Sequence, residues 1–541
     1  MTVENEVLTS VYRCPDGTEF PVTWEEPGDV RKTWKWEQEH APDPMKPLEM
    51  AMGKLTRPGT ARAFEEADVP TPALFRGGRI GNGYVFFPAD LQLHPDEQQS
   101  LYNAVARLVE REGGVWEVWA GFCLPRIEAA CAKLLRSTKG ATLAEIGEMQ
   151  GYGMRMTHVA GSHALFASTI AKFVEFGNEI GVDGERLFVD LSQGFPNTTF
   201  KANAVLWDLA EIADRLPSVR ATLLESESKR VWDTIRGLSD GQEFVSAFEA
   251  YLEQYGCRAG SWSLSAPTWQ EDPAAPLRMI RRILEEKPPT PEETLSEGAK
   301  RRAAVTKEIE DRLGDDADRL ARFREMCEPL RYYIPIREAR AYWQLVVTGI
   351  MRGLLLKRGQ RLVERGVVVK EDDVLYLVPE EIESALLGEA DDLSSLVDER
   401  REKWEFWAQR RPPEAIGGEG EAELPDDGAS SAVDDGVIRG VAASRGVVTA
   451  RARVLADIGD ADRLQRGDVL VCAMSSPPWT PLFALASGVV TDSGGILSHP
   501  AIVAREYGIP CVVGTRVGTE VIRDGAMITV DGDVGTVRVE G

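Results

Sequence analysis

The stretch that decides the fold of the C-terminal region runs from Val489 to Pro510 and reads VVTDSGGILSHPAIVAREYGIP. It begins with a β-branched run typical of a buried strand, continues through a Gly-Gly loop and ends in a short pattern typical of a helix. Pro500 suits the first position of that helix, and Gly508 suits its C-terminal cap. The pattern therefore predicts a strand, a glycine loop and a helix that begins beside His499.

His499 is placed by this pattern at or next to the N-cap of the helix. The helix dipole disfavours an imidazolium cation there and favours a neutral, nucleophilic imidazole. The same dipole, together with the free backbone N–H groups of the first turn, favours an attached phosphoryl anion. We therefore expect a histidine that carries phosphate; the alternative is a loop histidine whose hydrogen bonds are satisfied.

Residues 437–541 resemble the phosphohistidine, or swivelling, domain of the PEP-utilising enzymes. The resemblance rests on the His499 segment, on RGVAAS at 439–444 and GDVLV at 467–471, and on Asp524-Gly525, VDG at 530–532 and Gly535. In that family the histidine accepts phosphate in one active site and delivers it in another, so the resemblance implies this role for His499. It also implies a small α/β domain.

The sequence departs from the family pattern at three positions. Pro500 stands where Ala is usual, Leu497 where the dikinases carry a regulatory Thr, and Arg445 where Pro is common. Proline is tolerated at a helix start, and none of the three changes removes the nucleophile. The residues expected to support the phosphohistidine by hydrogen bonding are Thr491, Ser493, Ser498 and Arg505, of which Thr491 and Arg505 fit the family pattern best.

Composition indicates an ordinary globular protein. The 541 residues are enough for about two to four domains, and no run of about 18 apolar residues predicts a membrane span. The N-terminus does not read as a signal peptide, and the seven scattered cysteines form no C-x-x-C pair. These features predict a cytoplasmic protein without a structural zinc site. A net charge of −25 argues against nucleic-acid binding and favours an uncharged acceptor.

Residues 412–436 are predicted to form a flexible acidic linker, because they contain no Lys or Arg and are rich in Gly, Pro, Ser and acidic residues. We interpret the linker as a hinge on which the His499 domain travels; the alternative is a disordered insertion. Upstream, residues 1–411 are predicted to be mainly helical, with some strands near the N-terminus. Predicted helices span 96–112, 126–135, 164–180, 203–216, 241–255 and 337–365, and predicted strands span 8–14, 20–24, 83–87, 446–454, 468–472 and 527–530.

The helical region resembles the acceptor-binding domain of the rifampicin phosphotransferase family. The matching stretches are WEQEHAPDPMKPL at 36–48, YGCR at 255–258, WQEDP at 269–273 and EDDVLYL at 371–377. The region shows neither the glycine-rich loops of an ATP-grasp module nor the repeated strand–helix pattern of a PEP-binding barrel. The resemblance implies the acceptor-plus-carrier half of a split enzyme, as in phenylphosphate synthase, with Mg²⁺ and ATP bound mainly by a separate ATP-grasp subunit.

Phosphoryl transfer to a hydroxyl needs a base and cations. His158 and His163 are the candidate bases, Arg258 is the cation favoured by the resemblance, and Arg337 and Arg340 lie three apart on one predicted helix. The residues expected to bind the acceptor are Arg337, Arg340, Trp262 and Tyr333. The alternatives are helix caps for the histidines, surface ion pairs for the arginines and ordinary packing for the aromatic residues.

The sequence therefore predicts one subunit of an ATP-dependent, dikinase-type phosphotransferase. Phosphate would pass through His499 from an ATP-grasp partner to a hydroxyl, phenolic by our prediction, of a small aromatic acceptor, which makes the protein an aryl phosphate synthase. Two alternatives stay open: a non-catalytic phosphocarrier or regulatory protein, and PEP-dependent phosphotransfer with a different partner. The sequence does not identify the acceptor itself.

Overall fold

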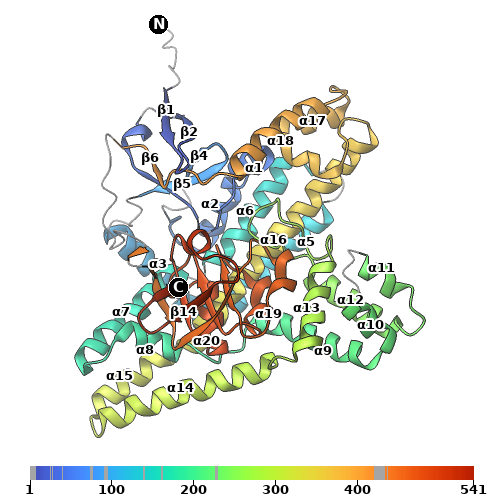
Figure 1. The fold of residues 1–541 in the computed structure, drawn as a ribbon. Coiled ribbons are helices and arrows are strands. Elements are labelled where there is room, and N and C mark those ends of the chain that lie inside the picture. The colour runs from blue at the N-terminus through green and yellow to red at the C-terminus, as the bar shows by residue number, and fades with distance from the viewer. Residues whose placement is uncertain are drawn as a thin grey trace. The chain divides into compact units, whose positions relative to one another are not determined.

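The computed structural model (Figure 1) describes residues 8–540 except 25, 27, 39, 73–76, 90–94, 138–140, 160–161, 226–229, 419–432 and 435. The chain forms two compact units that interleave in sequence. The first unit comprises Met1–Ala164, Ser261–Ala266 and Trp343–Gly428, and the second comprises Leu165–Gly260, Pro267–Tyr342 and Ala429–Gly541. The centre of the predicted linker lies outside the described residues, so the linker stays a prediction.

The first unit combines two small sheets with helices. β1 (Leu8–Arg13) pairs with β2 (Glu19–Trp24), and a four-stranded antiparallel sheet has the order β4 (Arg79–Gly81), β5 (Tyr84–Pro88), β3 (Trp34–Trp36) and β6 (Ala415–Ile416). Along β2, burial alternates so that every second side chain enters the core. Its longer α-helices are α1 (Pro47–Leu55), α2 (Arg57–Glu66), α3 (Pro95–Glu112), α5 (Leu124–Arg136), α6 (Leu143–Val159), α17 (Pro379–Leu387) and α18 (Ser394–Ala408), with the later part of α16 (Leu330–Glu364).

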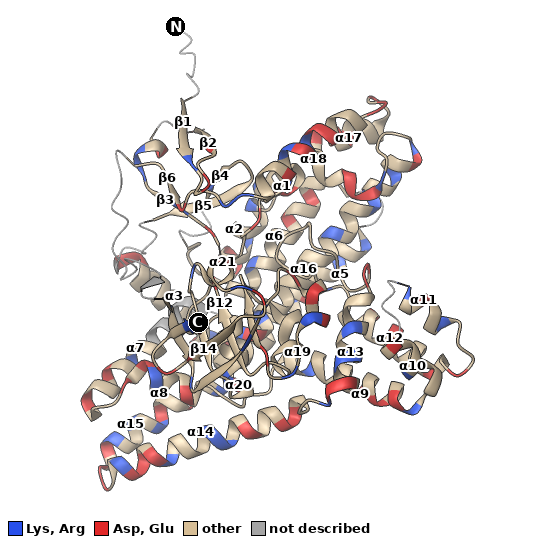
Figure 2. Ribbon diagram, in the orientation of Figure 1, with Lys and Arg blue, Asp and Glu red and all other residues tan. Residues whose placement is uncertain are grey.

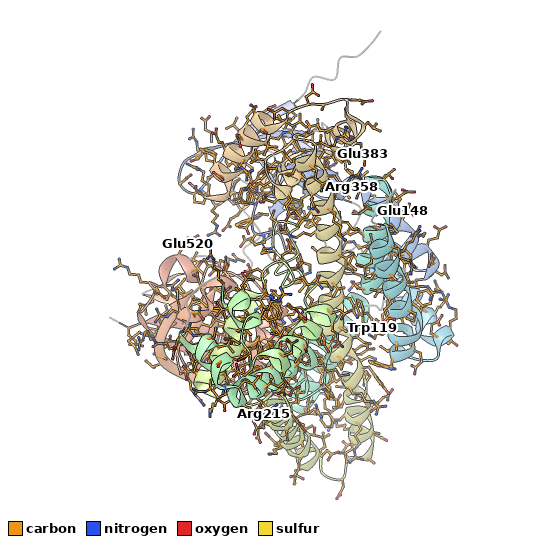
Figure 3. All side chains as sticks on the ribbon, turned by 90° about the vertical axis from the view of Figure 1, so that its right-hand side faces the viewer. Trp119, Glu148, Arg215, Arg358, Glu383 and Glu520 are labelled. Carbon is orange, nitrogen blue, oxygen red and sulfur yellow. The ribbon has the colours of Figure 1, made fainter. Side chains whose placement is uncertain are left out.

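α6 packs closely on its neighbours because it carries glycines at the contact. A Cβ atom on Gly151 would overlap the backbone carbonyl of Thr56, and one on Gly59 of α2 would overlap the carbonyl of Glu148. The Glu148 side chain pairs with Arg62 of α2, and Glu148 is labelled on α6 in Figure 3. Glycine at these positions therefore permits a helix spacing that any larger residue would prevent.

The second unit contains most of the remaining helices. They are the described part of α7 (Ser162–Ile180), α8 (Gly184–Leu191), α9 (Thr198–Arg215), α10 (Pro217–Glu225), α11 (Val231–Arg236), α12 (Gln242–Tyr255), α13 (Ala274–Glu286), α14 (Pro291–Leu313), α15 (Ala317–Cys327) and the first part of α16. α14 begins with a capping box between Thr290 and Glu293. Acidic and basic residues are interspersed along α14 and α15 (Figure 2), so neither helix presents a single-sign surface.

A nine-stranded sheet completes the second unit. Its order is β7 (Val433–Asp434), β8 (Val437–Arg439), β15 (Thr536–Val539), β14 (Met527–Asp531), β10 (Val447–Val454), β11 (Val469–Cys472), β12 (Gly488–Thr491), β13 (Cys511–Val513) and β9 (Val441–Ser444). The pairs from β10 to β13 are parallel, and the outer pairs are antiparallel. This mixed sheet confirms the predicted α/β character of the C-terminal region.

Both faces of this sheet are buried, which explains the unbroken apolar runs of β11 and β12. Leu470 and Val489 face one core, to which α20 (His499–Tyr507) and helices α9, α12 and α13 also contribute. Val471 and Val490 face the opposite core, which α21 (Gly518–Val521) covers. The core on the α20 side is therefore continuous with the helical segments. Among the described helices, none is both long and apolar enough to cross a bilayer.

Candidate active site

His499 is the first residue of α20. Ser498 precedes it as the N-cap with extended backbone angles (φ −68°, ψ 159°), and Gly508 ends the helix with a positive φ of 66°. The predicted strand–loop–helix is confirmed, with a shift of one residue: Pro500 takes the second helical position, where its missing N–H is still tolerated.

The imidazole of His499 lies between two polar side chains. Its Nδ1 is 3.5 Å from Glu338 Oε2 of α16, and its Nε2 is 3.4 Å from Thr480 Oγ1. The edge of the ring meets Phe483, with centroids 6.3 Å apart. The side chains of His499 and Glu338 are only 7% and 4% exposed, so the pair is largely shielded from bulk water.

This arrangement separates the roles of the two ring nitrogens. The carboxylate of Glu338 favours a proton on Nδ1, which leaves the lone pair on Nε2. The Thr480 hydroxyl donates at 2.9 Å to the carbonyl of Pro477, a shorter contact than the one to Nε2. No strong donor therefore occupies the Nε2 lone pair among the described residues, and this nitrogen is the better nucleophile.

Glu338 is held in place by Thr199, whose hydroxyl donates to the same Oε2 at 3.4 Å. Our reading of the sequence missed Glu338, Thr199 and Thr480. A weak signal was available for Glu338, which stands between the two arginines singled out on α16, at Arg337 and Arg340. Both arginines lie on α16 as predicted, and Tyr333 is buried one turn before Arg337. Their role in acceptor binding stays a prediction.

The residues expected to support the phosphohistidine contact backbone in this structure. Thr491 donates at 2.7 Å to the carbonyl of Ser493, and Ser498 donates at 2.7 Å to the carbonyl of Gly495. Arg505 donates through Nη1 to the carbonyl of Ile496 at 2.7 Å. These bonds hold the Gly-Gly loop that leads into His499; direct hydrogen bonds to a phosphohistidine stay a prediction for all three.

Arg258 is a buried cation, with 1% of its surface exposed. Its guanidinium carbon lies 4.7 Å from the ring centroid of Trp269, and its Nη2 donates to the hydroxyl of Tyr251 at 3.3 Å. Nη1 has no hydrogen-bond partner among the described residues. A buried cation with a spare N–H suits an anionic group. Ser476, which donates to the carbonyl of Gly260 at 3.0 Å, ties the Arg258 loop to the loop that leads to Thr480.

His158 and Trp262 come together in the first unit through Gln344. Trp262 Nε1 donates to Gln344 Oε1 at 3.1 Å, and Gln344 Nε2 lies 3.2 Å from His158 Nε2. His158 Nδ1 is 3.1 Å from the carbonyl of Met154, so it carries the proton and Nε2 accepts from Gln344. As a base, His158 would first have to release Gln344. The side chain of His163 lies outside the described residues.

Two further features bear on the electrostatics. Burial raises the pKa of Glu506, in the last turn of α20, to about 7, although its carboxylate accepts a hydrogen bond from the backbone N–H of Gly194 at 2.7 Å. Within the described part of the chain, no group of three or more His, Cys, Asp or Glu side chains could hold a metal ion.

Comparison with known families places two parts of the chain. Residues 153–338 match the model of the rifampicin phosphotransferase fourth domain. Residues 464–535, which include His499, match the model of the PEP-utilising enzyme mobile domain. The two matches bear out the resemblance seen in the sequence.

Three curated relatives illustrate the similarity. Rifampicin phosphotransferase of a Streptomyces species is 33% identical over 63% of this chain and 40% of its own length. The prodigiosin synthesizing transferase PigC of Serratia marcescens is 30% identical over 63% and 39%. Chondramide synthase cmdD of Chondromyces crocatus is 29% identical over 97% of this chain and 14% of its own length. The chain thus spans less than half of the length of each relative.

Proposed function

Because the chain carries the mobile domain of the PEP-utilising enzymes and the fourth domain of rifampicin phosphotransferase, we propose that it is a phosphotransferase that carries phosphate on His499. The observation that supports this most strongly is the setting of His499. The ring begins α20, its Nδ1 faces a buried carboxylate, and the lone pair of its Nε2 is available.

The proposed reaction has two half-reactions. In the first, Nε2 attacks the β-phosphorus of the donor ATP; a P–N bond forms, the P–O bond to AMP breaks, and water cleaves the P–O bond to the γ-phosphate, which leaves as inorganic phosphate. The ring becomes cationic, and the Glu338 carboxylate stabilises that charge through Nδ1. In the second, the acceptor oxygen attacks the phosphorus, the P–N bond breaks, and the hydroxyl proton passes to a base. His158 or His163 stays our sequence-based proposal for that base.

We propose ATP as the donor, bound with Mg²⁺ by an ATP-grasp partner rather than by residues 1–541. The absence of a glycine-rich phosphate loop from residues 1–411 supports this. The predicted hinge at 412–436 would let the C-terminal segment reach the partner. Leaving the docked position would expose the core that β11, β12 and α20 share with α9, α12 and α13. Binding to the partner must offset that cost.

We propose a small aromatic alcohol, of phenol type, as the acceptor. The resemblance to phenylphosphate synthase supports this class. The surroundings of Arg258 also support it, because the guanidinium carbon lies 4.7 Å from the ring centroid of Trp269 and 5.6 Å from that of Tyr342. Nη1 of Arg258 would donate to a phosphoryl oxygen during the second half-reaction.

The test mixes the full chain with [β-³²P]ATP, Mg²⁺ and the ATP-grasp protein encoded nearest to its gene. We expect acid-labile label on the wild-type chain, none above background on His499→Ala, and wild-type labelling on the control His40→Ala, which alters a half-exposed histidine of the first unit. Phenol and p-cresol should then discharge the label, whereas cyclohexanol should not.

Each other outcome identifies a rival. Label on His499 that no hydroxylated compound discharges would support a phosphocarrier. Labelling from [³²P]PEP but not from ATP would show that PEP, and not ATP, is the phosphoryl donor. Full labelling of His499→Ala would refute the scheme.

A further inference from the structure

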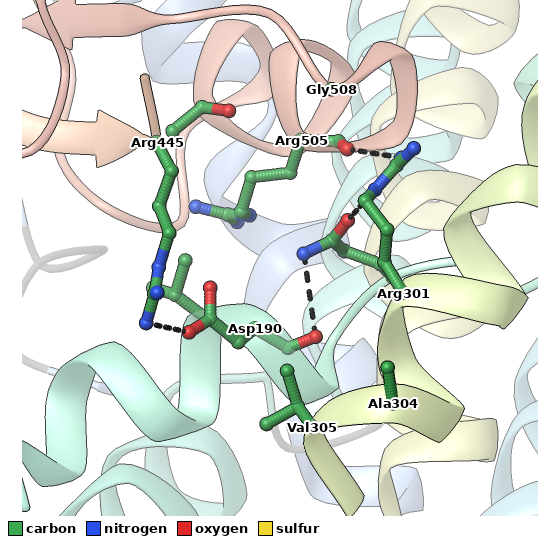
Figure 4. Close-up of a pocket in the computed structure, with 10 residues that line it drawn as sticks. Asp190, Arg301, Ala304, Val305, Arg445, Arg505 and Gly508 are labelled. Atoms are coloured by element: carbon green, nitrogen blue, oxygen red, sulfur yellow. Dashed lines mark hydrogen bonds and ion pairs between the residues drawn. The ribbon is translucent and has the colours of Figure 1, made fainter. Parts of the chain in front are cut away.

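A cavity of about 290 Å³ lies in the second unit, between α8, α14, the end of β9 and the last turn of α20. Figure 4 shows the residues that line it, among them Asp190, Arg301, Ala304, Arg445 and Arg505. Along the axis of α20, Arg505 lies about 9 Å from His499, at 1.5 Å per residue. Neither the mechanism above nor the family matches give this cavity a role.

Arg505 supplies the main evidence for a ligand. Its side chain is 3% exposed, and Nη1 is used by the carbonyls of Ala443 and Ile496. Nε and Nη2 are buried and have no hydrogen-bond partner among the described residues. These two N–H groups point from one edge of the guanidinium, which is the geometry that pairs with two oxygens of one anion. In Figure 4 the guanidinium of Arg505 is directed toward Asp190 and Arg445.

The carboxylates nearest to Arg505 do not pair with its free N–H groups. Arg445 forms an ion pair with Asp190, which is the one carboxylate among the residues that line the cavity. Arg301 donates to the side chain of Gln193 and to the carbonyls of Arg505 and Glu506. Three guanidinium groups thus face one carboxylate.

The opposite wall is apolar. Val189 of α8 and Ala304 and Val305 of α14, which line this side, have hydrocarbon side chains. A volume of about 290 Å³ lies at the lower end of the roughly 300–1,000 Å³ typical of small-molecule sites. The space therefore suits a ligand with one ring or a short branched chain beside its charged group.

We propose that this cavity binds a small carboxylic acid with a compact apolar body. Its carboxylate would pair with Nε and Nη2 of Arg505, and its apolar body would lie on Val189, Ala304 and Val305. A flat two-oxygen group matches the free edge of the guanidinium, and a single negative charge suits a cavity that already contains Asp190 better than a dianion does. Binding requires neither ATP nor a partner, but the cavity is complete only while the C-terminal segment is docked on α8 and α14, as it is in this structure.

The test measures binding to the full chain by calorimetry. The probes are benzoate, isobutyrate, inorganic phosphate and, as the neutral counterpart of benzoate, benzyl alcohol. Ala304→Trp fills the cavity without changing its charges, and Ala303→Trp is the matched control, since Ala303 is exposed on the same helix and does not line the cavity. Asp190→Asn removes the competing carboxylate.

We expect benzoate or isobutyrate to bind, with affinity at least tenfold weaker in Ala304→Trp, within twofold of wild type in Ala303→Trp and severalfold stronger in Asp190→Asn. Benzyl alcohol should not bind. Equal or tighter binding of phosphate would overturn the carboxylate assignment. Absence of carboxylate binding, or binding unaffected by Ala304→Trp and Asp190→Asn, would overturn the site.

Discussion

At the residue scale, the contact between Glu338 and His499 gives the clearest prediction about the rate at which His499 is phosphorylated. Glu338→Gln keeps the size of the side chain but removes the negative charge that lies 3.5 Å from Nδ1 and that, in the proposed reaction, stabilises the cationic ring. We expect the rate of His499 labelling to fall about tenfold, close to the 1.4 kcal/mol that one weakened charged contact represents. Labelling rates under single-turnover conditions measure this effect.

A purely structural role for Glu338 would not alter the tautomer of His499. In ¹H–¹⁵N spectra of the ring, we expect the Nδ1–H form in the wild type and a mixture of tautomers in Glu338→Gln. Glu364→Gln, on an exposed position of the same helix, should leave both the rate and the spectrum unchanged. A slow variant with an unaltered tautomer would exclude the positioning role.

At the scale of elements, the glycines of α6 and α16 give a matched pair of substitutions. A Cβ on Gly151 would overlap the carbonyl of Thr56, whereas one on Gly353 would meet no atom within 4 Å. We expect Gly151→Ala to lower the unfolding free energy by about 1–3 kcal/mol through overpacking. Gly353→Ala should raise it by about 0.5–1 kcal/mol, because alanine restricts the unfolded chain. The midpoints of thermal unfolding of the two variants measure these changes. A higher midpoint than wild type for both variants would contradict the tight α6 contact.

Elements with strong local signals could be predicted from the sequence. The predicted helices at 96–112 and 241–255 correspond to α3 (Pro95–Glu112) and α12 (Gln242–Tyr255). α16 begins seven residues before the predicted Arg337, because Pro335 lies inside the helix where a proline usually ends one. Local sequence patterns do not show that a long helix can tolerate the backbone hydrogen bond that an internal proline removes.

The candidate site was predictable only where its residues are close in sequence. The loop and helix around His499 follow from a continuous pattern of apolar residues, glycines and prolines. Glu338 reaches His499 from another part of the chain, and Thr199, which holds it, is 139 residues away from Glu338. No local periodicity encodes such contacts, and the interleaving of the two units has the same cause.

At the scale of the whole molecule, Glu506 couples stability to pH, because it lies where α20 meets the loop before α9. Its side chain is 1% exposed, Oε2 accepts from the N–H of Gly194, and Oε1 has no partner among the described residues. Burial raises the pKa of this carboxyl from 4.5 to about 7, although Arg505, Arg301 and Arg302 oppose the shift. Between these values the folded state holds a proton that the unfolded state has released, so this group makes the protein less stable as pH rises from about 4.5 to about 7.

Glu506→Gln removes this dependence while its amide oxygen can still accept from Gly194. The unfolding free energy of the variant minus that of wild type should rise by about 2 kcal/mol from pH 5.5 to pH 8. The reason is that pH 5.5 lies about 1.5 pH units below the raised pKa, and each unit corresponds to about 1.36 kcal/mol. Urea unfolding of both proteins at the two pH values gives the difference, and other titrating groups cancel in it. Glu520→Gln, at an exposed position on α21, should show no such change. A difference between Glu506→Gln and wild type that is independent of pH would mean that Glu506 is already ionised at pH 5.5, and the buried carboxylate would then be stabilised by its three arginines.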